Sequence, residues 1–160
     1  MILAVCTALA APIIGWTDLE SFGIQIVGSS KSGKSTVMKV AASIYSDQTY
    51  WETWSSTSNG IESIARARNN MLLCLDEFKQ CPAQEIGQLI YHLCNGVSKL
   101  RSQQDGALDK RYRWRTIFLS TGELTLEELL LGINQSVSAG QSVRLIEVPV
   151  FSKYDAFENT

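Results

Sequence analysis

The segment Gly28–Ser35 constrains the fold of this chain more than any other part of the sequence. It reads GSSKSGKS, fits the pattern G-x-x-x-x-G-K-[ST], and lies between a predicted strand, Phe22–Val27, and a predicted helix, Ser35–Tyr45. Glycines in such a loop let backbone N–H groups turn inward around phosphate oxygens, and the following helix adds the positive end of its dipole. The segment therefore predicts a triphosphate-binding loop; the alternative is a Ser/Gly-rich surface loop.

The residues of this loop have distinct expected roles. Lys34 would reach the β- and γ-phosphates of a bound nucleotide, and Ser35 would place its hydroxyl on Mg²⁺. The expected cofactors are therefore ATP and Mg²⁺. Nucleotide contacts are expected from Gly28, Ser29, Ser30, Lys31, Ser32, Gly33, Lys34, Ser35 and Thr36.

The rest of the chain alternates between patterns typical of strands and patterns typical of helices. Met71–Leu75 is a continuous apolar run of the kind found in strands that are covered on both faces. This alternation predicts an α/β fold with a central, mostly parallel five-stranded sheet and helices on both faces. The expected strands are Phe22–Val27, Thr49–Trp54, Met71–Leu75, Thr116–Leu119 and Arg144–Val150, and further helices are expected at Ser58–Asn69, between Pro82 and Gly96, and at Thr125–Leu131, where Thr125 and Glu128 form a capping box.

Length and composition fit a single domain over residues 1–160, with 45% apolar residues and a net charge of −2. The apolar run 1–15 is interrupted by Pro12 and Gly15 and is shorter than the ~20 residues that span a bilayer. We expect it to be a core helix rather than a membrane anchor, and its abrupt start suggests a fragment of a longer protein. The four cysteines form no C-x-x-C pair, which favours buried reduced thiols and a cytoplasmic location.

Two carboxylates follow the apolar run Met71–Leu75. Asp76 and Glu77 stand at the carboxyl end of a predicted strand, where open α/β sheets bind their ligands. Asp76 is expected to hold Mg²⁺ through water, and Glu77 to accept the proton of an attacking water. An Asp-Glu pair at a strand end also commonly marks a strand entering a solvated turn, and only the phosphate loop favours the functional interpretation.

A basic segment lies in a predicted hairpin, whose arms Ser98–Arg101 and Arg111–Arg115 flank a polar turn that contains Gly106. Because the chain as a whole is not basic, any nucleic-acid contact must come from a local patch such as this one. Basic side chains on one strand face could follow a phosphate backbone, while Tyr112 and Trp114 anchor the other face. Equally, charges could protect an edge strand from aggregation. The basic residues are Lys99, Arg101, Lys110, Arg111, Arg113 and Arg115.

Four stretches together carry a resemblance to a known family. They are FGIQIVGSSKSGKSTVMKVAASIY, TSNGIESIARARNNMLLCLDE, FLSTGE and GQSVRLIEVP. They resemble the helicase-like ATPase domain of phages, plasmids and other mobile elements known as domain-of-unknown-function family nine-hundred-twenty-seven. The motifs are similar in turn to the AAA+ superfamily, especially superfamily 3 and poxvirus-type primase–helicases. The resemblance implies a three-layer P-loop NTPase fold of AAA+ type with an inserted β-hairpin.

The resemblance also implies roles for individual residues. Lys34 and Ser35 become the phosphate and magnesium residues, and Asp76 and Glu77 the metal and base pair. The sensor that orients the attacking water falls on Ser120 or Thr121, where the wider helicase group usually places Asn. Single-stranded DNA contacts fall on the basic residues of the hairpin, foremost Lys99 and Arg101. The other expected contacts are Lys110, Arg111 and Arg113. Arg144 resembles an arginine finger acting on ATP held by a neighbouring subunit; its alternative is an ordinary strand-edge arginine.

These expectations define a Mg-ATP-hydrolysing, helicase-like ATPase that translocates on single-stranded DNA during mobile-element replication. The full-length protein is expected to form a homo-oligomeric ring, a hexamer. No membrane partner is expected. One alternative is a nucleotide-binding scaffold or inactive helicase relative without strand separation. A small-molecule kinase is a third option, which would need an acceptor pocket and an arginine-bearing lid that the sequence does not identify.

Overall fold

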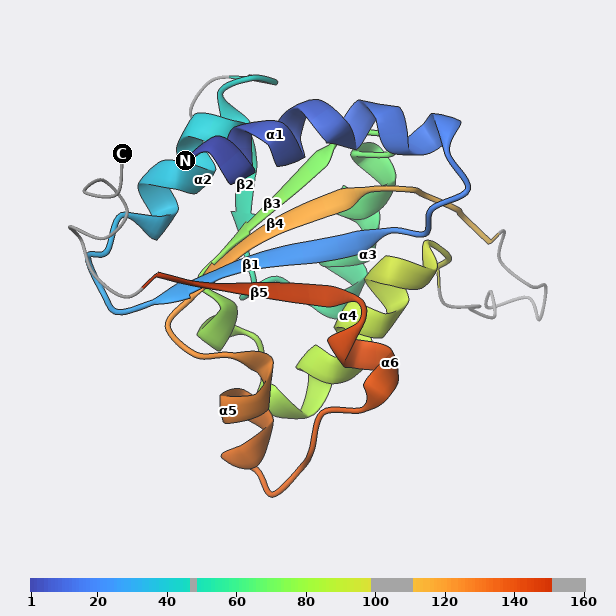
Figure 1. The fold of residues 1–160 in the computed structure, drawn as a ribbon. Coiled ribbons are helices and arrows are strands. Elements are labelled where there is room, and N and C mark those ends of the chain that lie inside the picture. Colours follow the sequence, from blue (N-terminus) through green and yellow to red (C-terminus); the bar gives the residue numbers. More distant parts are fainter. Residues whose placement is uncertain (47–48, 99–110, 151–160) are drawn as a thin grey trace.

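A five-stranded sheet forms the centre of the molecule in the computed structural model, which describes residues 1–46, 49–98 and 111–150. All neighbouring strands pair in parallel, in the order β2-β3-β4-β1-β5 (Figure 1). The carboxyl ends of all five strands therefore lie at one edge of the sheet. The strands are β1 (Phe22–Gly28), β2 (Trp51–Thr53), β3 (Leu72–Asp76), β4 (Ile117–Gly122) and β5 (Leu145–Val150).

Helices cover both faces of this sheet, as the alternating sequence pattern predicts. In Figure 1, α1 and α2 lie on one side, and α4, α5 and α6 lie on the other. The α/β three-layer architecture is thereby confirmed. The helices are α1 (Ile2–Ala10), η1 (Ala11–Trp16), α2 (Lys34–Ala42), α3 (Ser58–Ala67), η2 (Phe78–Gln80), α4 (Ala83–Asn95), α5 (Leu126–Leu131) and α6 (Ala139–Ser142).

Two hydrophobic cores form because successive side chains of a strand point to opposite faces of the sheet. In β3, Leu72 and Cys74 pack with residues of α1 and α2, whereas Leu73 and Leu75 pack with residues of α3 and α4. Phe118 of β4 joins the second core, and it is fully buried. Burial on both faces explains why the central strands read as continuous apolar runs.

Local sequence signals set several helix ends. The Thr125 hydroxyl accepts the Glu128 N–H at 3.1 Å, and the Glu128 carboxylate accepts the Thr125 N–H at 2.7 Å, so the expected capping box is present. Gly96 ends α4 with φ 63°, the left-handed conformation that favours glycine. The short helix α6 was not expected; it begins with a second capping box, formed by Ser138 and Gln141.

The N-terminal run forms α1 and η1, and Ala4, Thr7 and Ala8 are buried, as expected of a core helix. One cysteine differs from expectation, since Cys6 is exposed on the outer side of α1. Cys74, Cys81 and Cys94 are buried free thiols, and burial raises the pKa of each to about 12, which keeps them protonated.

Within the described parts of the chain, no helix combines the length and the apolar character needed to cross a bilayer.

The base of the predicted hairpin is present between α4 and β4. Val97 and Arg113 form an antiparallel bridge, and the Ser98 N–H donates to the Tyr112 carbonyl at 2.9 Å. Trp114 is buried and donates its indole N–H to the Leu93 carbonyl at 3.0 Å, which anchors this arm on α4. The turn of the hairpin lies outside the described residues, and so do Lys99, Arg101 and Lys110.

Candidate nucleotide-binding site

The loop between β1 and α2 depends on two glycines. Gly33 has φ 89°, a left-handed conformation that a side chain would strain. A Cβ atom on Gly28 would lie 2.6 Å from the Val150 carbonyl oxygen, so any side chain there would clash with the backbone of β5. The glycines of the motif are therefore required by the conformation of this loop, which argues against an ordinary surface loop.

Lys34 begins α2, and its ammonium group turns back into the loop. Its Nζ donates to the Gly28 carbonyl at 2.8 Å, to the Ser29 carbonyl at 2.6 Å and to the Ser32 hydroxyl at 3.2 Å. The residue is only 9% exposed. All three acceptors are neutral, so the positive charge that they hold inside the loop is available to an anion.

Asp76 is the point where three elements of the site meet. Its Oδ1 accepts hydrogen bonds from the Ser35 hydroxyl at 3.2 Å and from the Thr121 hydroxyl, and the Glu77 N–H donates to the same oxygen at 3.1 Å. Ser35 belongs to α2, Asp76 ends β3, and Thr121 lies near the end of β4. The parallel sheet thus brings the expected metal pair, Ser35 and Asp76, into direct contact.

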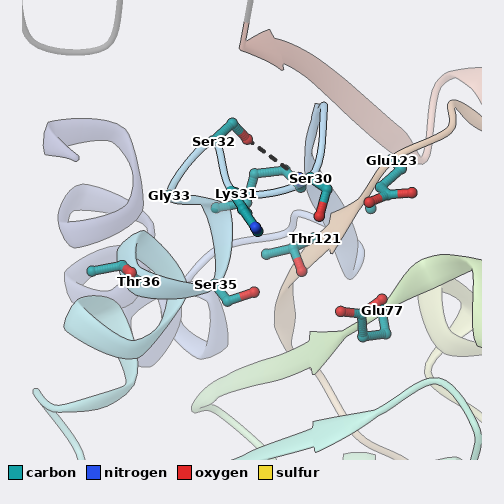
Figure 2. Close-up of a pocket in the computed structure, with 11 residues that line it drawn as sticks. Ser30, Lys31, Ser32, Gly33, Ser35, Thr36, Glu77, Thr121 and Glu123 are labelled. Atoms are coloured by element: carbon teal, nitrogen blue, oxygen red, sulfur yellow. Dashed lines mark hydrogen bonds between the residues drawn. The ribbon is translucent and has the colours of Figure 1, made fainter. Parts of the chain in front are cut away.

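Glu77 has an unusual backbone conformation for its residue type. Its φ and ψ are both 61°, in the left-handed region, and its side chain is exposed. Figure 2 shows Glu77 across an open space from Ser35 and Thr121. Left-handed non-glycine residues cost free energy and cluster at functional sites. The conformation of Glu77 therefore agrees with a functional role for its carboxylate.

These residues enclose a cavity of about 240 Å³ beside the loop. Two residues of its wall, Gly122 and Glu123, were not expected. A Cβ on Gly122 would lie 2.8 Å from the Cβ of Phe78, so glycine permits the close approach of this wall to η2. Their position at the carboxyl end of a buried apolar strand is the sequence signal that could have identified them. The cavity is lined by Ser30, Lys31, Ser32, Gly33, Lys34, Ser35, Thr36, Glu77, Thr121, Gly122 and Glu123.

The two candidate sensor residues point to opposite sides of β4. Thr121 lines the cavity and donates to Asp76. Ser120 is fully buried, and its hydroxyl accepts the Trp54 indole N–H at 2.9 Å, away from the cavity. The structure therefore brings Thr121, and not Ser120, to the candidate site.

Arg144 lies at the other edge of the sheet. Its carbonyl accepts the Gly23 N–H at 2.8 Å, level with the start of β1, whereas the phosphate loop follows the end of β1 at Gly28. Gly23 and Gly28 are about 16 Å apart along an extended strand. The Arg144 guanidinium donates to the Gly140 carbonyl at 2.8 Å, packs over the Tyr91 ring and pairs with Glu20. Arg144 therefore does not reach the nucleotide cavity of its own chain.

The described basic residues of the hairpin lie near this same edge, before β4. Arg111 and Arg113 are exposed, whereas Arg115 donates to the Thr17 carbonyl and so anchors the segment before β1. The Arg66 guanidinium lies 3.4 Å from the centre of the Tyr112 ring, so Tyr112 packs on α3. The alternation expected for this arm is present, with Trp114 inside and two arginines outside.

Family comparison adds to this geometry. Residues 1–114 match the family described as domain of unknown function (DUF927). The chain belongs to this family. No curated protein matches the sequence.

Solved structures are similar to this DUF927 domain to different degrees. One described as "SCCmec type IV Cch - active helicase" has a TM-score of 0.64 and 21% identity, and the match covers 92% of this chain and 27% of that one. NtrX from Brucella abortus in complex with ATP has a TM-score of 0.49 and 18% identity, covering 94% of this chain and 34% of that one. The DUF927 domain thus spans about a quarter of the helicase chain that it resembles, and it shares the helicase's P-loop-type fold.

Proposed function

We propose that this DUF927 domain binds a nucleoside triphosphate with Mg²⁺ in the cavity beside the loop and hydrolyses the γ-phosphate. One observation carries the proposal: the Asp76 carboxylate accepts hydrogen bonds from both Ser35 and Thr121, and these two residues line the cavity beside the loop. Loop, metal pair and sensor position therefore converge on one space. If these groups lay at opposite edges of the sheet, they could not act on one bound nucleotide.

The side chains of the site fit Mg²⁺. The ion prefers oxygen ligands and is usually bound by one or two carboxylates with substrate phosphates and waters. The Ser35 hydroxyl and the Asp76 carboxylate supply two such oxygens 3.2 Å apart. Among the described residues, no group of three or more His, Cys, Asp or Glu could hold a metal ion without a substrate. When bound, Mg²⁺ supplies neutralisation of the charge on the phosphates.

The protein's own groups divide the remaining work. The loop N–H groups and the Lys34 ammonium bind and orient the phosphates. The Glu77 carboxylate holds the attacking water and accepts its proton, and the Thr121 hydroxyl, whose proton Asp76 accepts in this structure, turns to donate to the γ-phosphate when the nucleotide is bound. Glu77 reaches the cavity from the end of β3 and Thr121 from β4, so attacking water and transferred phosphate would be held from different strands.

A lysine pair on α2 tests nucleotide binding. Lys34→Ala removes the ammonium that the loop encloses, and we expect ATP affinity to fall at least about a hundredfold because several charge-assisted hydrogen bonds are lost. Lys39→Ala is the matched control, since Lys39 is exposed on the same helix and lies 4.9 Å from the Trp51 ring centre. Titration calorimetry measures both. Unchanged affinity in Lys34→Ala would refute the loop assignment.

We further propose that the domain works in the cytoplasm as part of a ring, a hexamer, that translocates on single-stranded DNA. The hairpin base supports this, because Arg111 and Arg113 are exposed there. Lys99, Arg101 and Lys110 belong to the same predicted hairpin. The second candidate is a scaffold that binds ATP without moving DNA, and it needs only the loop and the Lys34 ammonium that the loop encloses.

DNA-dependent turnover separates these two functions. We expect single-stranded DNA to stimulate ATP hydrolysis by the full-length oligomer, and Lys99→Glu with Arg101→Glu to weaken DNA binding and lower its salt slope by about two. Lys39→Glu, with its charge change on α2, is the control for net charge. ATP retention without stimulation would favour the scaffold, and an unchanged salt slope would make the hairpin an edge guard.

A further inference from the structure

A second cavity, of about 270 Å³, lies on the α1 side of the phosphate loop. Its outer walls are apolar: Leu3 and Ala4 of α1, Val37 of α2, and Val148 and Val150 of β5. The stretch 31–34 of the loop and Thr36 line both this cavity and the cavity beside Asp76. The two spaces therefore adjoin the same loop from its two sides.

The sizes and chemistry of the two cavities suit two parts of one ligand. Each is slightly smaller than the roughly 300–1,000 Å³ of a typical whole-ligand pocket. The first cavity is polar and carries the carboxylates and the loop cation, whereas the second presents methyl and methylene groups. A nucleoside triphosphate has this same division, with a charged tail and a flat, largely apolar base.

We propose that the apolar cavity takes the base of the nucleotide and holds it by shape and apolar contact, so that the domain accepts nucleoside triphosphates with little selection between bases. The inference rests on the proposed function, because it presumes that the phosphates occupy the loop. It specifies the substrate class more closely: the loop selects the triphosphate, and the apolar cavity adds affinity for any base that fits.

Weak selection between bases follows from the side chains of the outer wall. The side chains of Leu3, Val37 and Val148 offer no hydrogen-bonding atom, and among the described lining residues the polar side chains belong to the loop and its helix. Lys34 and Ser32 already bond within the loop. Apolar pockets separate similar ligands by roughly 10–200-fold, whereas sites that hydrogen-bond a substrate group separate them by 10⁴–10⁵.

Three ligands test this inference in titration calorimetry: ATP, GTP and inorganic tripolyphosphate, which carries the charged tail without a base. We expect ATP to bind at least tenfold more tightly than tripolyphosphate, and ATP and GTP to bind within about 200-fold of each other, the limit for apolar contact. Equal binding of ATP and tripolyphosphate would overturn the base site, and a preference above about 200-fold between ATP and GTP would overturn the weak selection. If neither ATP nor tripolyphosphate binds, the proposed function itself fails.

A matched pair of variants on α1 locates the base. Leu3→Ala removes part of the cavity wall, whereas Leu9→Ala removes the same atoms from an exposed position outside it; the two side chains are 43% and 57% exposed. We expect Leu3→Ala to weaken ATP binding three- to tenfold without changing tripolyphosphate binding, and Leu9→Ala to change neither. Val148→Ala on β5 repeats the comparison from the opposite wall. Unchanged ATP affinity in both cavity variants would overturn the proposal.

Discussion

At the scale of single residues, adjacent positions on one strand have separate tasks. Thr121 donates its hydroxyl to Asp76 in the cavity wall, and Ser120, one residue earlier, accepts a hydrogen bond from Trp54 in the core. Successive side chains of a strand point to opposite faces, so only one of the two could reach the nucleotide. The alternation of side chains along β4 thus decides between Ser120 and Thr121, which the residue types alone leave open.

Replacing each hydroxyl should separate these tasks. Thr121→Val is nearly isosteric and removes the donor at the cavity, so we expect ATP turnover to fall about tenfold or more with little loss of stability. Ser120→Ala leaves the buried Trp54 N–H without its acceptor, and we expect it to cost about 1–3 kcal/mol of unfolding free energy with turnover retained. Steady-state ATPase assays and urea unfolding measure the two effects. The reverse pattern would reassign the sensor to Ser120.

At the scale of elements, two side chains hold the segment that follows β4. Gln25 of β1 donates to the Leu124 carbonyl at 2.8 Å, and Glu147 of β5 accepts the Leu126 N–H at 2.7 Å, where α5 begins. Gln25 and Glu147 lie opposite each other in the sheet register. Gly122 and Glu123, which line the nucleotide cavity, directly precede this anchored segment. Side chains of β1 and β5 therefore help to hold this wall of the cavity in place.

The Glu147 carboxyl gives this anchor a pH dependence. Burial raises its pKa above the ordinary 4.5, helped by the nearby Glu128 and Glu127 charges and opposed by the Leu126 N–H. The folded state therefore favours the protonated form, and its stability falls as pH rises from 4.5 through the raised pKa. Glu147→Gln keeps the acceptor oxygen and cannot ionise.

We accordingly expect Glu147→Gln to be more stable than the native chain at pH 7, with the difference disappearing below pH 4.5. Urea unfolding at several pH values measures this difference. Glu85→Gln, on α4, is the control for loss of one carboxylate. A variant that is less stable at pH 7 would show that the ionised carboxylate is needed to hold Leu126 N–H.

At the scale of the whole molecule, the sheet separates two groups of candidate functional residues. The nucleotide cavity lies at the carboxyl ends of the strands, whereas Arg144 and the hairpin base lie at the opposite edge. A strand length of about 16 Å between them keeps Arg144 away from its own cavity. A role for Arg144 on ATP therefore requires a second subunit, which agrees with the proposed ring.

Mixed oligomers test such sharing of sites. Glu77→Gln and Arg144→Ala full-length subunits should each hydrolyse ATP slowly on their own, since one lacks the base and the other the arginine, which is worth ~10³–10⁵ in rate. We expect a mixture to regain turnover, because some interfaces pair an intact Glu77 with an intact Arg144. Activity equal to the sum of the separate variants would mean that Arg144 acts within its own chain or only on structure.

Short-range patterns in the chain account for much of the fold. The loop spacing of Gly28–Ser35, the apolar run before Asp76 and the capping box at Thr125 are decided by neighbouring residues, and each appears where it was expected. The four-residue helix α6 escaped notice because so short a helix leaves no apolar periodicity. The placement of Asp76 and Glu77 beside the loop was also predictable from their position at a strand end.

Other features depended on how distant segments pack together. The strand order sets β4 between β1 and β3, and this placement brings Thr121 to Asp76 and adds Glu123 to the cavity wall. The parallel pairing of β5 with β1 leaves Arg144, which precedes β5, at the far edge. The apolar cavity arises only because α1 and β5, from the two ends of the chain, meet beside the loop. Local conformation is encoded by adjacent residues, but cavities and hydrogen bonds between strands come into existence only when the sheet assembles.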